Sequence, residues 1–317
     1  MSNELAQKPK FSVAISSSAY QKLINNTLGD PERSKRFVGS ITSAVAVNPE
    51  LQKCDAGTIL AGALLGESLN LSPSPQLGQY YLVPFDCKVR GADGKIIYKT
   101  DENGQKITDD KNRWVPVTEK RAQFCLGYKG YIQLALRSGQ YKRLIVVTVK
   151  EGEFIGWDPF DEILRCNWNE SEEREQLETV GYAARFEYLN GFSKTIYWSK
   201  EKMLAHADKY SPAFSAEDMK RVENGQIPDK DMWKYSSFWY KNFDEMAMKT
   251  MLRQLIGKWG VMSTEFCTAY EHDNKAVTMD AGGNFISGEE APLGIADKQM
   301  VSEAAGAEAE KVNLEDI

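Results

Sequence analysis

Cysteine and histidine are scarce in this chain of 317 residues, which contains five cysteines and only two histidines, His206 and His272. No two cysteines form a CxxC pair, and an odd number of scattered cysteines is typical of reduced thiols that pack as small apolar side chains. Structural zinc sites and histidine-based nucleophilic sites both need such residues in clusters. The sequence therefore disfavours both kinds of site, and we expect no cofactor.

Long apolar runs are absent as well. No stretch approaches the roughly 18–20 uncharged apolar residues that cross a membrane, and residues 1–10 lack the apolar middle section of a secretory signal. We therefore expect a cytoplasmic protein without membrane contact. The chain is 42% hydrophobic and 26% charged, which is enough apolar side chain for a globular core.

The phosphate-binding motif GxxxxGK[ST] is also missing. Gly94-Lys95 and Gly257-Lys258 lack both the preceding glycine and the following Ser or Thr. A motor driven by ATP hydrolysis is therefore not expected.

The net charge of −6 is distributed unevenly along the chain. Residues 271–317 contain eleven acidic residues and three lysines, a balance of −8. Subtracting −8 from −6 leaves +2 for the remaining chain, so an acidic tail accompanies a mildly basic body. For a polyanionic ligand, the clustering of charge within that body matters more than the total.

Periodicity and turn signals predict an α+β fold. Helices are expected at residues 18–28, 31–47, 55–69, 128–137, 199–208 and 236–258, and strands at 79–89, 121–126, 141–150, 153–157, 163–168, 180–189 and 194–198. Turn signals between residues 90 and 119 predict a long hairpin. We expect a flexible arm (1–15), a helical oligomerisation region (16–70), a core (71–270) and a disordered acidic tail (271–317). Packing within one subunit is the competing role for the helices before residue 70.

Residues 120–150 carry charge of one sign. They contain seven cations and no Asp or Glu, with aromatic residues interleaved: Lys120, Arg121, Lys129, Arg137, Lys142, Arg143 and Lys150, and Phe124, Tyr128, Tyr131 and Tyr141. A protein that binds single strands without sequence preference needs cations along a groove and aromatic faces for bases, worth about 1–3 kcal/mol each. Gly127 and Gly130 flank a turn whose N–H groups could meet a phosphate at a helix N-terminus.

The competing interpretation is a solvated basic face over core tyrosines. Tyr131 lies on the apolar side of its helix with Leu134 and Ala135, so we expect it to pack rather than to stack on a base.

A second basic pattern lies in the helix expected at 236–258. Ala247, Met251 and Leu255 fall on one face, while Lys249 and Arg253 lie opposite, one turn apart, where they could contact adjacent phosphates. The alternative is an ordinary surface in which Glu245 pairs with Lys249. Asp244 falls on the apolar face, and the sequence does not explain it.

Two other functional classes stay open at this point. A nuclease would need clustered carboxylates for Mg²⁺, and the nearest candidates are Asp158, Asp161 and Glu162, which we expect to form an ordinary turn beside Gly156 and Pro159. A passive binding protein could coat single strands without promoting their pairing.

These residues lie in blocks that resemble the RecT family of phage-type single-strand DNA annealing proteins. The order and spacing of the blocks cover roughly residues 55–265: LNLSPSPQLGQYYLVPF (69–85), QFCLGYKGYIQLALRSGQYKRL (123–144), YAARFEYLNGFSKTIYWSKEKM (182–203) and DEMAMKTMLRQL (244–255). The hairpin at 86–119 is longer and more polar than the family pattern, so no contact is transferred there.

The resemblance implies a β-β-β-α core and ATP-independent annealing in phage-type recombination. It also implies a homo-oligomer, ring or helical filament, that binds single-stranded DNA and nascent duplex beside an exonuclease and a host single-strand-binding protein. The matching positions Lys129, Arg137, Lys249 and Arg253 are the expected lining of a DNA groove. Lys120, Arg121, Tyr128, Lys142 and Arg143 are added mainly from the pattern of charged and aromatic residues. No catalytic residue is expected.

Overall fold

The computed structural model describes residues 11–89, 95–109, 112–211, 213–279 and 285–287. The chain divides into two compact units. Within the described residues, unit 1 comprises 11–134 and 263–287, and unit 2 comprises 135–262. The expected boundaries at residues 15, 70 and 270 do not coincide with this division.

Unit 1 begins with helices α1 (Phe11–Ile15), α2 (Ser18–Leu28), α3 (Pro31–Ala46) and α4 (Ala56–Ser68), with a short 3₁₀ helix, η1 (Leu51–Lys53), before α4. The helices expected at 18–28, 31–47 and 55–69 are confirmed. Asp30 Oδ1 accepts from the N–H of Glu32 at 2.8 Å, and Asp55 Oδ1 accepts from Thr58 N–H at 3.1 Å, so both act as N-caps.

Residues 11–15 were expected to belong to a loose arm, and that expectation is wrong. They form α1 because Phe11 and Ile15, four residues apart, are both buried in unit 1. Residues 1–10 lie outside the described residues.

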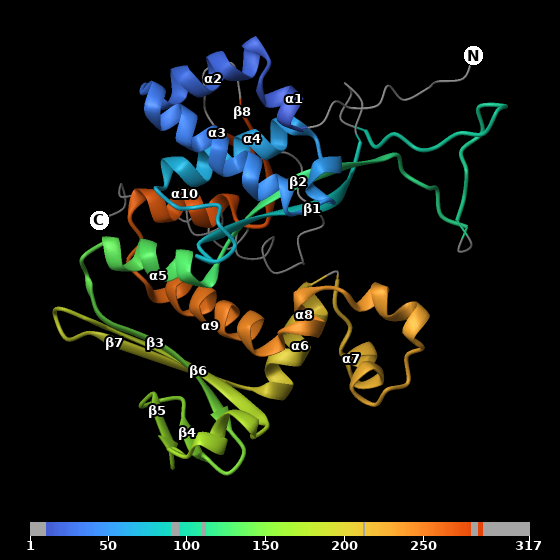
Figure 1. The fold of residues 1–317 in the computed structure, drawn as a ribbon. Coiled ribbons are helices and arrows are strands. Elements are labelled where there is room, and N and C mark those ends of the chain that lie inside the picture. The colour runs from blue at the N-terminus through green and yellow to red at the C-terminus, as the bar shows by residue number, and fades with distance from the viewer. Residues whose placement is uncertain (1–10, 90–94, 110–111, 212, 280–284, 288–317) are drawn as a thin grey trace, which may run out of the picture. The chain divides into compact units, whose positions relative to one another are not determined.

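The sheet of unit 1 has the antiparallel order β1 (Tyr80–Lys88), β2 (Thr118–Leu126), β8 (Lys275–Met279) and β9 (Phe285–Ser287). Helix α4 packs against β2 and β8 (Figure 1). The same helix also approaches β1 closely, because a Cβ at Gly66 would lie 2.3 Å from the ring of Tyr80.

Strands β8 and β9 correct the expectation that disorder begins at residue 271. Ala276 and Val277 are fully buried in the sheet of unit 1. Residues 288–317, which carry most of the expected acidic tail, lie outside the described residues.

The expected long hairpin between β1 and β2 is confirmed as paired segments. Residues 97–99 bridge residues 115–117 through N–H to O=C bonds of 2.8 Å, and residue 107 bonds to 99 at 2.9 Å. The rings of Tyr98 and Trp114 lie 5.4 Å apart, and the Lys106 ammonium lies 3.9 Å from the Trp114 ring. The hairpin is therefore stabilised by contacts between its own paired segments.

Helices α5 (Tyr128–Arg137) and α10 (Thr264–His272) complete the packing around β2. Tyr131 is fully buried, its hydroxyl donates to Asp273 Oδ2 at 2.8 Å, and its ring lies 5.8 Å from Phe266. The other oxygen of Asp273 accepts from Leu126 N–H at 2.8 Å. The expectation that Tyr131 packs in the core is confirmed.

Unit 2 contains an antiparallel sheet in the order β3 (Tyr141–Lys150), β6 (Thr179–Tyr188) and β7 (Ser193–Ser199). A separate hairpin, β4 (Phe154–Asp158) with β5 (Ile163–Cys166), precedes η2 (Glu172–Gln176). Helix α9 (Phe243–Trp259) covers one face of the three-stranded sheet (Figure 1). Three antiparallel strands followed by a covering helix fit the expected β-β-β-α arrangement, and the α+β fold class is confirmed.

The remaining helices of unit 2 are α6 (Lys200–Tyr210), α7 (Ala216–Glu223), η3 (Asp229–Tyr235) and α8 (Phe238–Lys241). The single helix expected at 236–258 is wrong, because the chain breaks at Asn242 (φ −139°, ψ 60°) into α8 and α9. The break lets rings from both helices pack on Phe214, whose ring centroid lies 5.8 Å from both Trp239 and Phe243. Across the described residues, no helix is long and apolar enough to cross a membrane.

Candidate nucleic-acid interface

Lys129 is an exposed cation in the first turn of α5, in unit 1. Its aliphatic stem lies beside Gly78, where an added Cβ would be 3.7 Å from Lys129 Cδ. Among the residues that the structure describes, no carboxylate forms an ion pair with it. The neighbouring Tyr128 is half-buried, and burial raises the pKa of its hydroxyl. Lys129 is therefore available to a phosphate, while only part of Tyr128 is open to solvent.

The two glycines that flank this turn serve packing rather than phosphate access. Gly127 N–H donates to Gln79 O at 2.8 Å, so that N–H is not open to an anion. A Cβ on Gly127 would lie 2.2 Å from Gly78 O, and one on Gly130 would lie 2.0 Å from Gln79 O. The expected role of this turn as an open phosphate cradle is wrong for Gly127, because the start of α5 presses against the backbone of the preceding loop.

Lys120 and Arg121 of β2 are held by carboxylates and point to opposite faces of their sheet. Lys120 Nζ lies 3.5 Å from Glu50 Oε2 and 3.6 Å from Asp86 Oδ1. Arg121 Nη2 lies 2.5 Å from Glu119 Oε1. Neighbouring residues of a strand alternate between faces, so these two cannot line one groove side by side.

Three of the predicted cations of unit 2 are exposed: Arg137 at the end of α5, and Lys142 and Arg143 at the start of β3. Lys142 Nζ lies 2.5 Å and Arg143 Nε 3.9 Å from the carboxylate of Glu187. The Lys142 ammonium holds the pKa of that carboxyl below its ordinary value. One carboxylate therefore neutralises part of the charge of this pair.

Arg143 also lies on the face of the sheet that is turned away from α9. It pairs in register with Glu187, whereas Phe186 and Tyr188, the neighbours of Glu187, point to the other side. Tyr188 donates from its hydroxyl to Trp259 O in α9 at 3.2 Å, which identifies that other side as the helix-covered face. Arg143 and the cations of α9 are therefore separated by the sheet.

On α9 the predicted division into two faces is confirmed. Ala247, Met251 and Leu255 are fully buried, while Lys249 and Arg253 are partly exposed. The alternative pairing of Lys249 with Glu245 is not seen in the described part of the chain.

Asp244, which the sequence did not explain, anchors α9 to the sheet. Its two carboxylate oxygens accept from the hydroxyls of Tyr182 and Thr179, each at 2.6 Å. A carboxylate on an apolar helix face is stable here because it meets two hydroxyl donors of β6.

Four basic side chains act electrostatically on His206 of α6. They are Lys202 and Lys209 on α6, and Arg253 and Lys258 on α9. Of these four, only Arg253 was predicted to lie in an interface. The sequence signal for Lys202 and Lys209 was their spacing from His206 by four and three residues, which puts all three on one face of a helix.

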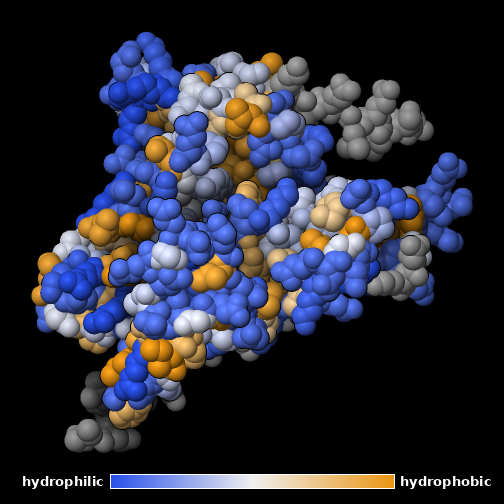
Figure 2. Space-filling view, turned by 60° about the horizontal axis from the view of Figure 1, so that its bottom comes forward, coloured by the Kyte–Doolittle hydropathy of each residue, from blue (hydrophilic) through white to orange (hydrophobic). Residues whose placement is uncertain are grey.

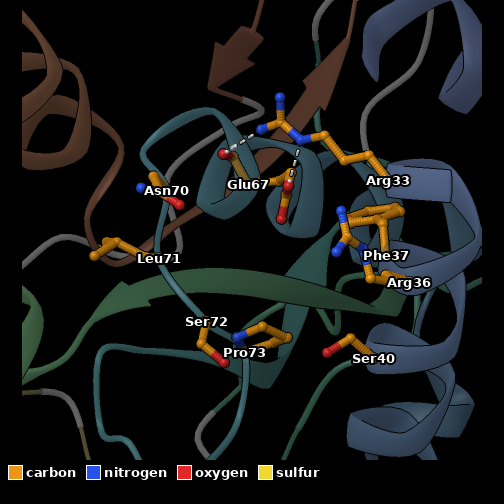
Figure 3. A pocket seen from close by; sticks show the side chains of 9 residues that line it. All are labelled: Arg33, Arg36, Phe37, Ser40, Glu67, Asn70, Leu71, Ser72 and Pro73. Carbon is orange, nitrogen blue, oxygen red and sulfur yellow. Dashed lines mark hydrogen bonds and ion pairs between the residues drawn. The ribbon is translucent and has the colours of Figure 1, made fainter. Parts of the chain in front are cut away.

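A pocket of about 410 Å³ lies in unit 1 between α3 and the segment after α4 (Figure 3). Arg33 Nε bonds to Glu67 Oε1 at 2.8 Å at its edge, and Arg36, Ser40 and Ser72 contribute polar groups. None of the predicted DNA-binding residues lines this pocket.

Two of the three carboxylates considered for a nuclease, those of Asp158 and Glu162, have structural partners. Asp158 Oδ1 accepts from the N–H groups of Phe160 and Asp161 at 2.9 and 3.2 Å, which caps the expected turn. Glu162 accepts from Lys194 Nζ and from Thr195 N–H at 3.0 Å. No group of three metal-ligating side chains is found within the described ranges.

The face shown in Figure 2 is mostly hydrophilic, with hydrophobic side chains in small separate patches.

Comparison with protein families and with curated proteins shows what this chain is related to. The family model described as "RecT family" matches residues 35–284, most of the chain. The chain belongs to the RecT family. Among curated proteins it is 32% identical over 252 residues to the uncharacterized protein YqaK of Bacillus subtilis, covering 79% of this chain and 67% of that protein. It is 25% identical over 259 residues to protein RecT of Escherichia coli, covering 81% and 78%.

Membership of the RecT family supports a role in DNA recombination by strand annealing and the binding of single-stranded DNA. Members of this family are annealing proteins rather than enzymes in the usual sense. The matched residues include Lys129, Arg137, Lys249 and Arg253, so the four positions assigned by motif all lie within the family region.

Proposed function

We propose that this protein binds single-stranded DNA without sequence preference and anneals complementary strands without ATP. The observation that carries the proposal is the family match over residues 35–284. Two basic surfaces support it: Lys129 at the start of α5 in unit 1, and Lys249 with Arg253 on α9 in unit 2. Annealing makes and breaks no covalent bond, so phosphate neutralisation and extension of the strand suffice.

The expected contribution of each cation to DNA binding depends on whether a carboxylate of the protein already pairs with it. Lys129 and Lys249 have no carboxylate partner among the described residues, whereas Lys142 is bonded to Glu187. A phosphate that binds Lys142 must first replace its ion pair with Glu187. We therefore rank Lys129 and Lys249 above Lys120, Arg121, Lys142 and Arg143 as DNA ligands, and we add Arg253 because it lies one turn from Lys249 on the same face of α9.

Salt dependence of binding tests this ranking. For a single strand, each phosphate contact adds about 0.7 to the slope of log K against log salt. We expect Lys129→Ala and Arg253→Ala to weaken binding to oligo(dT) and to a mixed-sequence strand alike, with slopes reduced by about 0.7 each. Lys142→Ala should change the slope less. Unchanged slopes for both Lys129→Ala and Arg253→Ala would remove these residues from the interface.

Annealing is tested by mixing two complementary labelled oligonucleotides with the protein and no nucleotide. Faster duplex formation than without protein supports the proposal. A protein that binds both strands but leaves the rate unchanged is a passive coating protein, the second candidate. Shortening of the labelled strands in the presence of Mg²⁺ would instead indicate the nuclease activity that we do not expect.

The assembly that we propose is a homo-oligomer, ring or helical filament, working beside an exonuclease and a host single-strand-binding protein. Helix α4 is buried throughout its central turns, so it is occupied within unit 1. Helices α2 and α3 keep exposed faces and are the better candidates for subunit contacts. Electron microscopy with two complementary strands added in sequence tests this, since oligomers should enlarge or become ordered on the second addition.

A further inference from the structure

One face of α6 carries basic and aromatic side chains that the predicted interface did not include. Lys202, His206 and Lys209 follow one another at intervals of four and three residues, and Tyr210 lies next to Lys209. Trp198, in the strand before α6, continues the same surface, because its ring lies 5.0 Å from that of His206. The ring of Tyr210 lies 4.5 Å from that of His206. The imidazole thus contacts two aromatic rings.

The two lysines of this face are positioned by rings rather than by carboxylates. Lys202 Nζ lies 4.8 Å from the centroid of Trp198, and Lys209 Nζ lies 5.1 Å from that of Tyr210. Both side chains are exposed, and neither forms an ion pair in the part of the chain that the structure describes. A ring attracts an ammonium without neutralising it. These lysines therefore keep their full charge, in contrast to Lys142.

The field at His206 is positive from every side that the structure shows. Lys202 and Lys209 act from its own helix, and Arg253 and Lys258 act from α9. Burial of the ring, followed by these cations, lowers the pKa of His206 to about 4. The imidazole is therefore neutral at pH 7 in the protein without DNA.

The acidic residues of α6 are engaged elsewhere. Asp208 Oδ1 accepts from Ala216 N–H at 2.8 Å, and Glu201 bonds with Ser199 at the N-terminus of the helix. In the described part of the chain no ion pair engages Lys202 or Lys209, whereas Glu187 counters Lys142 and Arg143. An anion from outside the chain can therefore bind these two lysines.

We propose that the α6 face (Lys202, His206 and Lys209) binds the sugar–phosphate backbone of a single strand together with Arg253 and Lys258; this rests on the DNA binding proposed above. As the strand binds, His206 takes up a proton from solvent. A phosphate against the imidazole supplies the negative charge that favours its protonated form. Protonated, the ring can donate a charge-assisted hydrogen bond to a phosphate oxygen. DNA binding and protonation of His206 are then linked, so each strengthens the other.

The size of the linkage follows from the two protonation states. If DNA restores the pKa of His206 from about 4 to its ordinary 6.5, binding is roughly ten times tighter at pH 5.5 than at pH 7.5. We expect this gain for wild-type protein and oligo(dT) at constant ionic strength. His206→Gln should abolish it, and His272→Gln, which changes the other histidine of the chain, should retain it. Calorimetry of binding in buffers of different ionisation enthalpy should show uptake of roughly one proton per subunit at pH 5.5, lost only in His206→Gln.

The lysines are tested separately from the histidine. Lys202→Ala and Lys209→Ala should each lower the salt slope of oligo(dT) binding by about 0.7 at pH 7.5. Lys220→Ala, an exposed lysine on α7 of the same unit, is the matched control and should leave the slope unchanged. Far-ultraviolet circular dichroism of every variant confirms that the fold is retained.

The outcomes separate this inference from the proposed function. If Lys129→Ala weakens binding while Lys202→Ala, Lys209→Ala and His206→Gln leave the salt slope and the pH dependence as in wild type, the α6 face is not a DNA site and the proposed function stands. If pH dependence persists in His206→Gln, another group takes up the proton and the linkage is refuted. Wild-type protein that binds no oligonucleotide in dilute salt rejects the proposed function and this inference with it.

Discussion

Asp244 ties the start of α9 to the sheet of unit 2. Its oxygens accept from the hydroxyls of Tyr182 and Thr179 at 2.6 Å each, and Lys150 Nζ donates to the Thr179 hydroxyl at 3.1 Å. The Tyr182 side chain is fully buried, and burial followed by the bond to Asp244 raises the pKa of its hydroxyl. We expect Asp244→Ala to destabilise unit 2 and to loosen the helix that carries the proposed DNA ligands.

The expected loss of stability in Asp244→Ala follows from the hydroxyl donors that the substitution leaves without an acceptor. Two hydroxyl groups lose their acceptor, and each buried polar group without a partner costs about 1–3 kcal/mol. Asp244 itself is only half-buried, so water can reach part of the vacated space. This places the expected loss in the free energy of unfolding at about 2–4 kcal/mol, a large part of the roughly 5–15 kcal/mol of a typical domain.

Urea unfolding followed by tryptophan fluorescence measures this loss from the shift in midpoint at constant slope. Tyr182→Phe removes one of the two bonds without a cavity, and a double-mutant cycle with Asp244→Ala should give a coupling of about 1–2 kcal/mol. Glu245→Ala, the neighbouring exposed carboxylate, is the matched control and should stay within about 0.5 kcal/mol of wild type. An Asp244→Ala variant as stable as Glu245→Ala would refute the anchoring role.

Two further predictions concern close packing and pH. Gly130→Ala should destabilise the protein by about 1–3 kcal/mol, because the new Cβ would lie 2.0 Å from Gln79 O. Gly39→Ala in α3 should stabilise the protein by about 0.5–1 kcal/mol, because nothing lies within 4 Å of its Cβ. The unfolding midpoints of the two variants check these opposite signs. Burial of Glu153 acts to raise its pKa, but the bonds from Arg174 and from the N–H groups of Lys150 and Asn169 together outweigh this and hold that pKa below its ordinary value. The stability from this pair is present above about pH 4.5 and is lost as the pH falls through the folded-state pKa, so Glu153→Gln should flatten the decline in unfolding midpoint between about pH 5 and 3.

The sequence predicted those elements whose signals are local. Helix α3 begins with an Asp30-Pro31 cap, and α4 follows the cap at Asp55, so both N-termini could be read from short motifs. Helix α5 was placed after a Gly turn, and strand β3 was placed from its content of Val and Ile. These signals depend on residues within one or two turns, and tertiary packing reinforces them.

Elements that depend on distant partners were missed. The apolar pattern runs through Asn242 without interruption, and the break there arises only when rings of α8 and α9 gather around Phe214. Strand β8 is short and lies in a segment that otherwise has the composition of the acidic tail. It is a strand because Ala276 and Val277 are buried between α4 and β2, which no local pattern could reveal.

The charge pattern shows most clearly why the sequence alone could not predict the whole interface. Residues 120–150 contain no acidic residue, yet Lys142 is paired with Glu187, 45 positions away in sequence, because β3 and β6 are neighbours in the sheet. Conversely, Lys202 and Lys209 lie in a segment with acidic neighbours and still keep their charge, because those carboxylates point elsewhere. Since counterion release counts only the cations that DNA can neutralise, the variants of Lys202 and Lys209 should lower the salt slope more than that of Lys142. The opposite order would mean that DNA displaces Glu187, and that the linear run of charge was the better guide.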